Sequence, residues 1–364
     1  MYSTFWSGGD GMIYVFVFQG EFGFELLNWQ GVVRKFATTI APEDKIICCS
    51  RANLYSLYEM ADEFVDISEV PLFKQSRASA YWGIFSPAEL PRYRLIGQFK
   101  EKSLKLLLRH QLKQFIWKNS QILQGNLNQP VRFILSARPT RINSCLFGWS
   151  RNDGVMDIYD LLDVENNLYR KIEPDLSWRS VIEERLKFSL DEPFLLIQTR
   201  KRDTSTKQPS PDLLETESLI EHLSRQVKIV LLSFDTGRWL DSHSDFPEKN
   251  IGYHYRCTSF PEQACLIYYA RHCLFLTEGD FGSHIYVPPM MGKDVTVVAP
   301  RSIFQLESTP IDFWNQKVFT CGGQVVAAIA ESVLSSDESL NQFSSHLLSK
   351  YLEISSVEET KSSL

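Results

Sequence analysis

The chain has 364 residues, of which 44% are hydrophobic and 23% are charged. This composition is typical of folded soluble proteins and excludes fibrous and disordered classes. The formal net charge of −6 provides no overall attraction to nucleic acid, which binds basic surfaces. Because the length exceeds that of a typical single domain, we expect two α/β domains, each with its own core.

Seven cysteines occur without a CxxC pair, and several lie in apolar segments. This usage predicts buried, reduced thiols in a cytoplasmic protein. The apolar run at 12–18 has no basic residue before it and ends at Gln19-Gly20-Glu21, so we interpret it as a buried strand and not as a signal peptide. No segment has the ~20 apolar residues that a membrane helix needs, which leaves only peripheral membrane association open.

Residues 1–150 begin with a βαβ pattern. An apolar strand at 13–18 is followed by a turn at Gly20 and Gly23 and then by an amphipathic segment at 24–38. Strands that alternate with helices favour a parallel sheet, so we predict a Rossmann-like acceptor domain here. The other elements expected in it are a helix around 54–61 and strands at 45–49, 63–67 and 131–136.

Residues 95–123 have apolar side chains at helical spacing, and their charges are mostly basic. A run of this kind usually marks the solvated face of a helix that covers a sheet. The alternative is a surface that docks on an anionic membrane or on the acceptor. The basic residues concerned are Lys100, Lys102, Lys105, Arg109, Lys113 and Lys118.

The polar residues 151–190 are predicted to connect the domains. A second regular alternation of strand and helix over 191–335 is typical of a doubly wound domain, which we predict to bind a nucleotide-sugar donor. Residues 336–364 are expected to form a helix near 343–352 and a disordered tail. The elements expected within 191–335 are strands at 194–198, 228–233, 273–277 and 295–299 and helices at 212–224, 261–271 and 283–291.

Open parallel sheets bind ligands beyond the carboxyl ends of their strands, so the residues that follow each strand are the candidates. The first junction runs from Gly20 to Gly23 and precedes a helix, whose free N–H groups suit an anion or a sugar hydroxyl. It lacks GxGxxG spacing, and a purely structural turn is an equal alternative. Glu21, or else Glu25, could act as a base on an acceptor hydroxyl.

The second junction is Gln198-Thr199-Arg200-Lys201-Arg202-Asp203, where three cations follow a strand directly. Adjacent positive charges repel one another, so this pattern favours a polyanionic ligand such as a diphosphate. An arginine here could also neutralise charge on a departing nucleotide. A basic surface loop is the alternative.

The third and fourth junctions also follow predicted strands. Asp235 could accept hydrogen bonds from a base or a ribose, or it could cap the next helix. In the loop 277–284, Asp280, Gly282 and Ser283 precede a helix and predict a phosphate-binding nest, whereas His284 is more simply structural. Because the histidines lack HExxH-like spacing and no Asp-x-Asp occurs, no metal site is predicted.

Together, the last three junctions resemble the donor-binding half of the fucosyltransferase superfamily, which includes α1,6-, nodulation and protein O-fucosyltransferases. The resemblance covers roughly residues 194–292. Gln198 stands where the family has a histidine, and Lys201 stands where it has a second arginine. The residues that match the three family motifs in order are Arg200 and Asp203, then Asp235, then Ser283.

This resemblance implies the GT-B fold, in which two Rossmann-like domains face each other across a cleft. It implies that Arg200 contacts the donor β-phosphate, that Asp203 and Asp235 help to hold guanosine, and that Ser283 helps to bind the diphosphate. The implied reaction is an inverting attack of an acceptor hydroxyl on the anomeric carbon, with no metal and no cofactor. A GDP-sugar such as GDP-fucose is the favoured donor, and a glycan, including a lipid-linked one, is the expected acceptor.

Two other interpretations stay open. A nucleotide-sugar epimerase or hydrolase would use the same fold without transfer to an acceptor, and a carbohydrate-binding module would keep the fold without turnover. A Rossmann dehydrogenase is disfavoured because neither a GxGxxG turn nor an acidic residue about 20 positions further on is evident.

Overall fold

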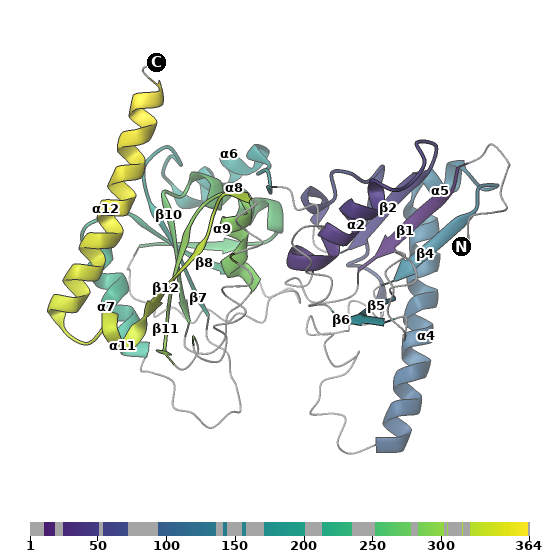
Figure 1. The fold of residues 1–364 in the computed structure, drawn as a ribbon, viewed down its shortest axis with the longest axis horizontal. Coiled ribbons are helices and arrows are strands. Elements are labelled where there is room, and N and C mark those ends of the chain that lie inside the picture. The colour runs from purple at the N-terminus through teal and green to yellow at the C-terminus, as the bar shows by residue number, and fades with distance from the viewer. Residues whose placement is uncertain are drawn as a thin grey trace. The chain divides into compact units, whose positions relative to one another are not determined.

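The computed structural model describes residues 11–18, 25–50, 54–71, 94–135, 141–143, 155–157, 171–200, 213–234, 252–277, 283–301, 304, 315 and 321–362. The chain divides into two compact units, Met1–Leu168 and Tyr169–Leu364. Their boundary lies within the segment 151–190 that was expected to connect the domains. Figure 1 shows the helices and strands of both units.

The N-terminal unit is built on a four-stranded parallel sheet with the order β3-β2-β1-β4. The apolar strand β1 lies inside this sheet and is largely buried, as expected of a strand covered on both faces. All four predicted strands are confirmed within one residue or so of their expected ends. They are β1 (Ile13–Val17), β2 (Lys45–Ser50), β3 (Glu63–Asp66) and β4 (Val131–Leu135).

The helices of this unit differ from prediction at two places. The helix expected around 54–61 is a single 3-10 turn, because the chain turns back so that the Asp62 carboxylate accepts the Ile46 N–H at 2.9 Å and β3 begins. The long helix divides at Ser120, whose hydroxyl accepts the Leu123 N–H and starts a second helix. The elements are η1 (Glu25–Trp29), α2 (Gln30–Ala37), η2 (Leu54–Leu57), α4 (Arg94–Asn119) and α5 (Gln121–Gly125). A short antiparallel pair, β5 (Arg141–Asn143) and β6 (Val155–Asp157), completes the described part.

The core of the N-terminal unit lies between the sheet and α4. Leu108, Leu112 and Ile116 recur at four-residue spacing and are buried against β1 and β2 residues such as Val15 and Ile47. This spacing places the three side chains on one side of the helix. The opposite side of α4 therefore faces solvent.

The C-terminal unit is built on a six-stranded sheet with the order β12-β11-β10-β7-β8-β9, and every neighbouring pair in it is parallel. Counted along the chain, this is the strand order 3-2-1-4-5-6 of doubly wound nucleotide-binding sheets. The predicted α/β class with two parallel sheets is thus confirmed. The strands are β7 (Leu195–Arg200), β8 (Ile229–Phe234), β9 (Tyr253–Cys257), β10 (His272–Thr277), β11 (Val295–Ala299) and β12 (Val325–Ile329).

Helices cover both faces of this sheet (Figure 1). On one face, buried residues of α7 and α12 pack on β7, β8 and β10. On the other face lie α8 and the helical segment η8–α9, in which two prolines at the start of α9 interrupt the single helix predicted at 283–291. The helices are η7 (Leu176–Trp178), α6 (Arg179–Leu186), α7 (Leu213–Ser224), α8 (Phe260–Tyr269), η8 (Ser283–Tyr286), α9 (Val287–Met290), α11 (Ala330–Val333) and α12 (Asp337–Ser362).

The C-terminal segment is more ordered than its composition indicates. In place of a helix at 343–352 with a disordered end, α12 spans Asp337–Ser362. Leu347 is buried in the core between α12 and the sheet, and Lys350 forms an ion pair with Asp294 at 2.8 Å. These contacts make α12 part of the folded C-terminal unit.

The six cysteines within the described ranges are buried, as predicted. They are Cys48, Cys49, Cys257, Cys265, Cys273 and Cys321. Among the residues placed by the structure, no helix combines the length and the apolar character needed to cross a bilayer.

Candidate functional site

The C-terminal sheet grows in two directions from the strand β7. β8 and β9 lie on one side of it, and β10, β11 and β12 lie on the other. The carboxyl ends of β7 and β10 therefore flank the topological switch point, where open α/β sheets bind their ligands. In the register of these two strands, Arg200 pairs with Thr277 and Thr199 pairs with Leu276.

The strands that precede the three resembling motifs are neighbours in this sheet. β8 pairs with β7 on the side opposite β10, with Gln198 beside Leu232, and it ends at Phe234. The order β10-β7-β8 thus brings the carboxyl ends of all three strands to adjacent positions on one edge. The sequence order of the motifs does not by itself require this, because strand order is not visible in a sequence.

Three predicted site residues belong to described elements through their backbone alone: Arg200 ends β7, and Ser283 and His284 begin η8. The other predicted residues of the two sites, apart from Gln198, lie outside the described residues. These are Gly20, Glu21 and Gly23 in the N-terminal unit and Lys201, Asp203, Asp235, Asp280 and Gly282 in the C-terminal unit.

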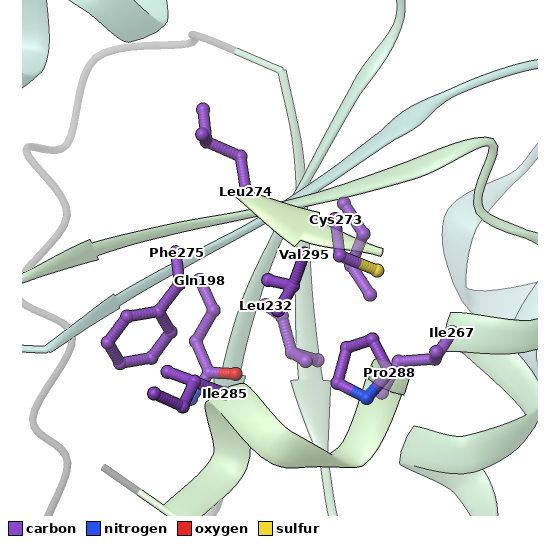
Figure 2. Close-up of a pocket in the computed structure, with 10 residues that line it drawn as sticks. Gln198, Leu232, Ile267, Cys273, Leu274, Phe275, Ile285, Pro288 and Val295 are labelled. Atoms are coloured by element: carbon purple, nitrogen blue, oxygen red, sulfur yellow. The ribbon is translucent and has the colours of Figure 1, made fainter. Parts of the chain in front are cut away.

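Gln198 is the predicted donor-site residue whose side chain is described. It is 8% exposed, and it lines a small pocket between the sheet and the segment η8–α9 together with Phe275, Ile285 and Pro288. Figure 2 shows its amide reaching from β7 toward Ile285. Within the described residues, the Gln198 Nε2 atom has no hydrogen-bond partner. The pocket has room for about one water molecule, so it is not itself large enough for a sugar or a nucleotide.

Glu25, the alternative base, begins η1 and lies in a buried polar cluster with Tyr58. Its side chain is 1% exposed, and its Oε1 atom accepts a hydrogen bond from the Tyr58 hydroxyl at 2.6 Å. Burial and the Glu25 carboxylate raise the pKa of Tyr58 well above its usual value, so Tyr58 stays a donor. Arg34 anchors the same region through a bidentate contact to Glu59 at 2.6 and 2.7 Å. This arrangement suits a structural role for Glu25 better than contact with an acceptor.

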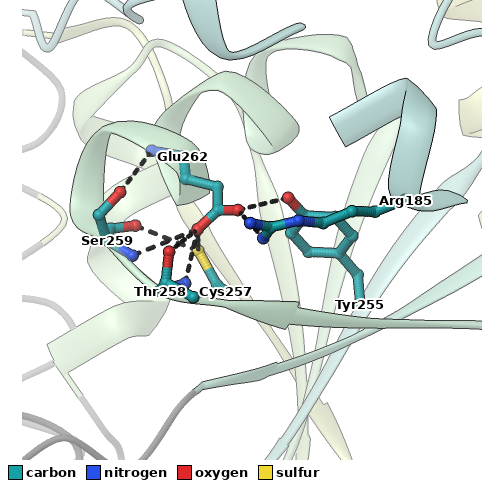
Figure 3. A network of polar contacts seen from close by, with 6 residues as sticks. All are labelled: Arg185, Tyr255, Cys257, Thr258, Ser259 and Glu262. Atoms are coloured by element: carbon teal, nitrogen blue, oxygen red, sulfur yellow. Dashed lines mark hydrogen bonds and ion pairs between the residues drawn. The ribbon is translucent and has the colours of Figure 1, made fainter. Parts of the chain in front are cut away.

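A second buried carboxylate, which the sequence analysis did not single out, is Glu262 in the first turn of α8 (Figure 3). It is fully buried, and its Oε1 atom accepts hydrogen bonds from Tyr255 at 2.5 Å and from Arg185 at 2.6 Å. Its Oε2 atom accepts from the N–H and the hydroxyl of Thr258 at 2.5 and 2.8 Å. Ser259 and Glu262 also form a capping box.

This network occupies the N-terminus of α8 with the protein's own carboxylate. A helix N-terminus that is already capped in this way offers no free N–H groups to a phosphate. Burial, followed by the hydrogen bond to Glu262, raises the pKa of Tyr255, which keeps its hydroxyl protonated. The first turn of α8, which follows β9, therefore has a structural role.

Over the described ranges, no three His, Cys, Asp or Glu side chains gather closely enough to hold a metal ion. The described residues thus define an α/β protein with two parallel sheets, and the candidate site is the carboxyl edge of β10, β7 and β8 in the second sheet.

No family model matches the chain, and no curated protein matches it. Among solved structures, it is similar to a glycosyl transferase of family 9 from Veillonella parvula, with 12% identity over 88% of this chain and 86% of the other and a TM-score of 0.47. It is also similar to E. coli ADP-heptose LPS heptosyltransferase II, with 12% identity, 92% and 99% coverage and a TM-score of 0.46. E. coli heptosyltransferase WaaC with ADP has 9% identity, 91% and 98% coverage and a TM-score of 0.41. Likeness at this level decides neither the reaction nor the substrate.

Proposed function

We propose that this chain is a GT-B glycosyltransferase that moves a sugar from a nucleotide-diphosphate donor to a hydroxyl of a glycan or lipid-linked acceptor. The donor diphosphate lies at the carboxyl ends of β7 and β10, the transfer inverts the anomeric centre, and no metal takes part. A GDP-sugar, with GDP-fucose first, is the donor that the motif resemblance favours.

The observation that carries this proposal is the pairing of Arg200 with Thr277 at the switch point of a 3-2-1-4-5-6 sheet. Arg200 opens the run of three cations that follows β7, and Thr277 opens the glycine-bearing loop that leads to Ser283. A guanidinium group and the first N–H groups of a helical segment are two standard ways in which proteins bind phosphate. Both belong to chain segments that leave the sheet at adjacent positions.

In the proposed reaction, the acceptor oxygen forms a bond to the anomeric carbon while the bond from that carbon to the donor phosphate oxygen breaks. The nucleoside diphosphate leaves with an added negative charge, which Arg200 neutralises as it develops. The acceptor hydroxyl loses its proton to Glu21, which follows β1 in the N-terminal unit. β1 lies between β2 and β4, so its carboxyl end, which precedes Glu21 in the sequence, lies at the switch point of the first sheet.

Nucleotide binding tests this proposal. We expect GDP to raise the melting temperature of the wild-type protein in the presence of EDTA, with smaller effects for UDP and ADP, because a ligand that binds only the folded state stabilises it. Incubation of a GDP-sugar with and without candidate acceptors then separates transfer from hydrolysis or epimerisation. If no nucleotide changes the melting temperature, the donor-site assignment is wrong.

A further inference from the structure

The helix α4 concentrates positive charge in a chain that is acidic overall. Over Arg94–Asn119 its sequence contains seven lysine or arginine residues and one acidic residue, Glu101, whereas the whole chain has a net charge of −6. The described side chains begin at Leu106, and from there to Asn119 the helix has no acidic residue at all. The charge is therefore not balanced along the helix by neighbours of opposite sign.

Part of this charge lies on the side of α4 that the core leaves exposed. Leu108, Leu112 and Ile116 are buried against the sheet. Arg109, His110, Lys113 and Lys118 are exposed. Lys113 lies over the ring of Phe133 at 5.2 Å, but Arg109 and Lys118 form no ion pair with any residue that the structure describes. Two cationic side chains are thus held on a rigid helix without a partner in the described part of the protein.

Two leucines of the same helix are also exposed, and Leu106 precedes Arg109 by about one turn. Leu106 is 65% exposed and Leu107 is 46% exposed. A helix that presents both cationic and large apolar side chains to solvent offers an anionic lipid surface an electrostatic and an apolar contact.

We propose that the exposed face of α4 binds the surface of an anionic lipid bilayer. Arg109 and Lys118 contact lipid phosphates, and Leu106 and Leu107 enter the boundary between headgroups and acyl chains. Clusters of four to eight basic residues on one helix have the charge that anionic lipid surfaces attract. The contact is peripheral.

The exposed leucines favour a lipid surface over two other partners. A nucleic acid would be attracted by the cations alone and would leave the leucines in water. A second copy of α4 would bring like charges together, which opposes association. A bilayer surface satisfies both kinds of side chain at once.

Sedimentation with lipid vesicles tests this proposal without donor or acceptor, so its outcome does not depend on the proposed transferase activity. The full chain is mixed with vesicles of phosphatidylcholine alone or with vesicles of phosphatidylcholine and phosphatidylglycerol. In a separate sample it is mixed with duplex DNA that carries the same total negative charge as the anionic vesicles. We expect binding to the anionic vesicles, weakening with salt, and neither to the neutral vesicles nor to DNA.

Two double variants and two matched controls locate the surface. Arg109→Gln with Lys118→Gln is expected to lower the partition coefficient by up to ~30-fold, and Leu106→Ser with Leu107→Ser by at least ~10-fold. Arg225→Gln with Lys187→Gln removes the same charge elsewhere, and Leu127→Ser with Leu176→Ser removes two other exposed leucines; both are expected to leave the partition coefficient unchanged.

Each contrary result would overturn the proposal. Equal binding to neutral vesicles would remove the role of charge, and equal losses in the control variants would show that α4 is not the contact. Binding to DNA in place of vesicles, or dimerisation that the α4 variants abolish, would identify a different occupant. Absence of vesicle binding by wild-type protein whose melting curve shows it folded would leave α4 as an ordinary solvated helix.

Discussion

Arg200 and Thr277 are paired across neighbouring parallel strands, each as the last residue of its strand. This pairing places the starts of two motifs that are about 80 residues apart in the sequence next to each other at the switch point of the sheet.

Glu262 is predicted to stabilise the fold and to play no part in nucleotide binding. Glu262→Ala leaves Arg185, Tyr255 and the Thr258 N–H without their shared acceptor. We therefore expect the free energy of unfolding to fall by about 3 kcal/mol. Urea denaturation measures this loss, with the exposed Glu221→Ala as the control. Equal stability of the Glu262→Ala variant and wild type would contradict the role assigned to the network.

His272 is predicted to make stability depend on pH. Burial, with a smaller effect of Lys350, lowers the pKa of His272 to about 4, whereas a histidine in an unfolded chain titrates near ~6.5. Between these pH values the unfolded chain holds a proton that the folded protein does not. Stability therefore rises with pH across this window and is lost as the pH falls, by on the order of 3 kcal/mol.

His272→Gln is expected to flatten that pH dependence, because glutamine does not titrate and can still contact the Thr296 hydroxyl, which lies 2.9 Å from the His272 Nε2 atom. The exposed His346→Gln serves as the control and should keep the wild-type slope. Chemical denaturation at a series of pH values from 4 to 7 provides the comparison. An unchanged slope in the His272→Gln variant would assign the acid sensitivity to other groups.

The packing of Leu347 against the C-terminal sheet is predicted to stabilise the position of α12. Leu347→Ala leaves a cavity in the core that also contains Leu219 and Leu274, and we expect a loss of about 3 kcal/mol in the free energy of unfolding. Asn341→Ala, at an exposed position of the same helix, should have little effect. A Leu347→Ala protein as stable as wild type would mean that α12 is not part of this core.

The strands of both sheets could be predicted where their residues form continuous apolar runs. β9 and β12 were missed for a physical reason: β9 carries the exposed residues Tyr253, His254 and Arg256, as an edge strand can, and its sequence Tyr253–Cys257 therefore shows no apolar run. β12 is a continuous apolar run, but its two alanines favour a helix and it is followed directly by α11, so the sequence alone does not separate strand from helix here. Without these two outer strands the predicted sheet has four strands in place of six.

The candidate site could be predicted only in part. Strand ends identified Arg200 and the loop toward Ser283, but the adjacency of β10, β7 and β8 depends on strand order, which is set by tertiary packing. The Glu262 network had a local signal, since Ser259 and Glu262 have the spacing of a capping box. Arg185 lies 77 residues from Glu262 in the sequence, and nothing local indicates that contact.

The proposed function depends most directly on the binding of the donor diphosphate by Arg200. Calorimetric titration with GDP in EDTA tests it most directly, on wild type, on Arg200→Ala and on Arg225→Ala, in which an exposed arginine that pairs with Glu221 is removed. Loss of a charged hydrogen bond predicts a ~10- to 100-fold rise in Kd for Arg200→Ala, with Arg225→Ala unchanged. GDP binding of equal strength in all three proteins, or in none, would contradict the claim.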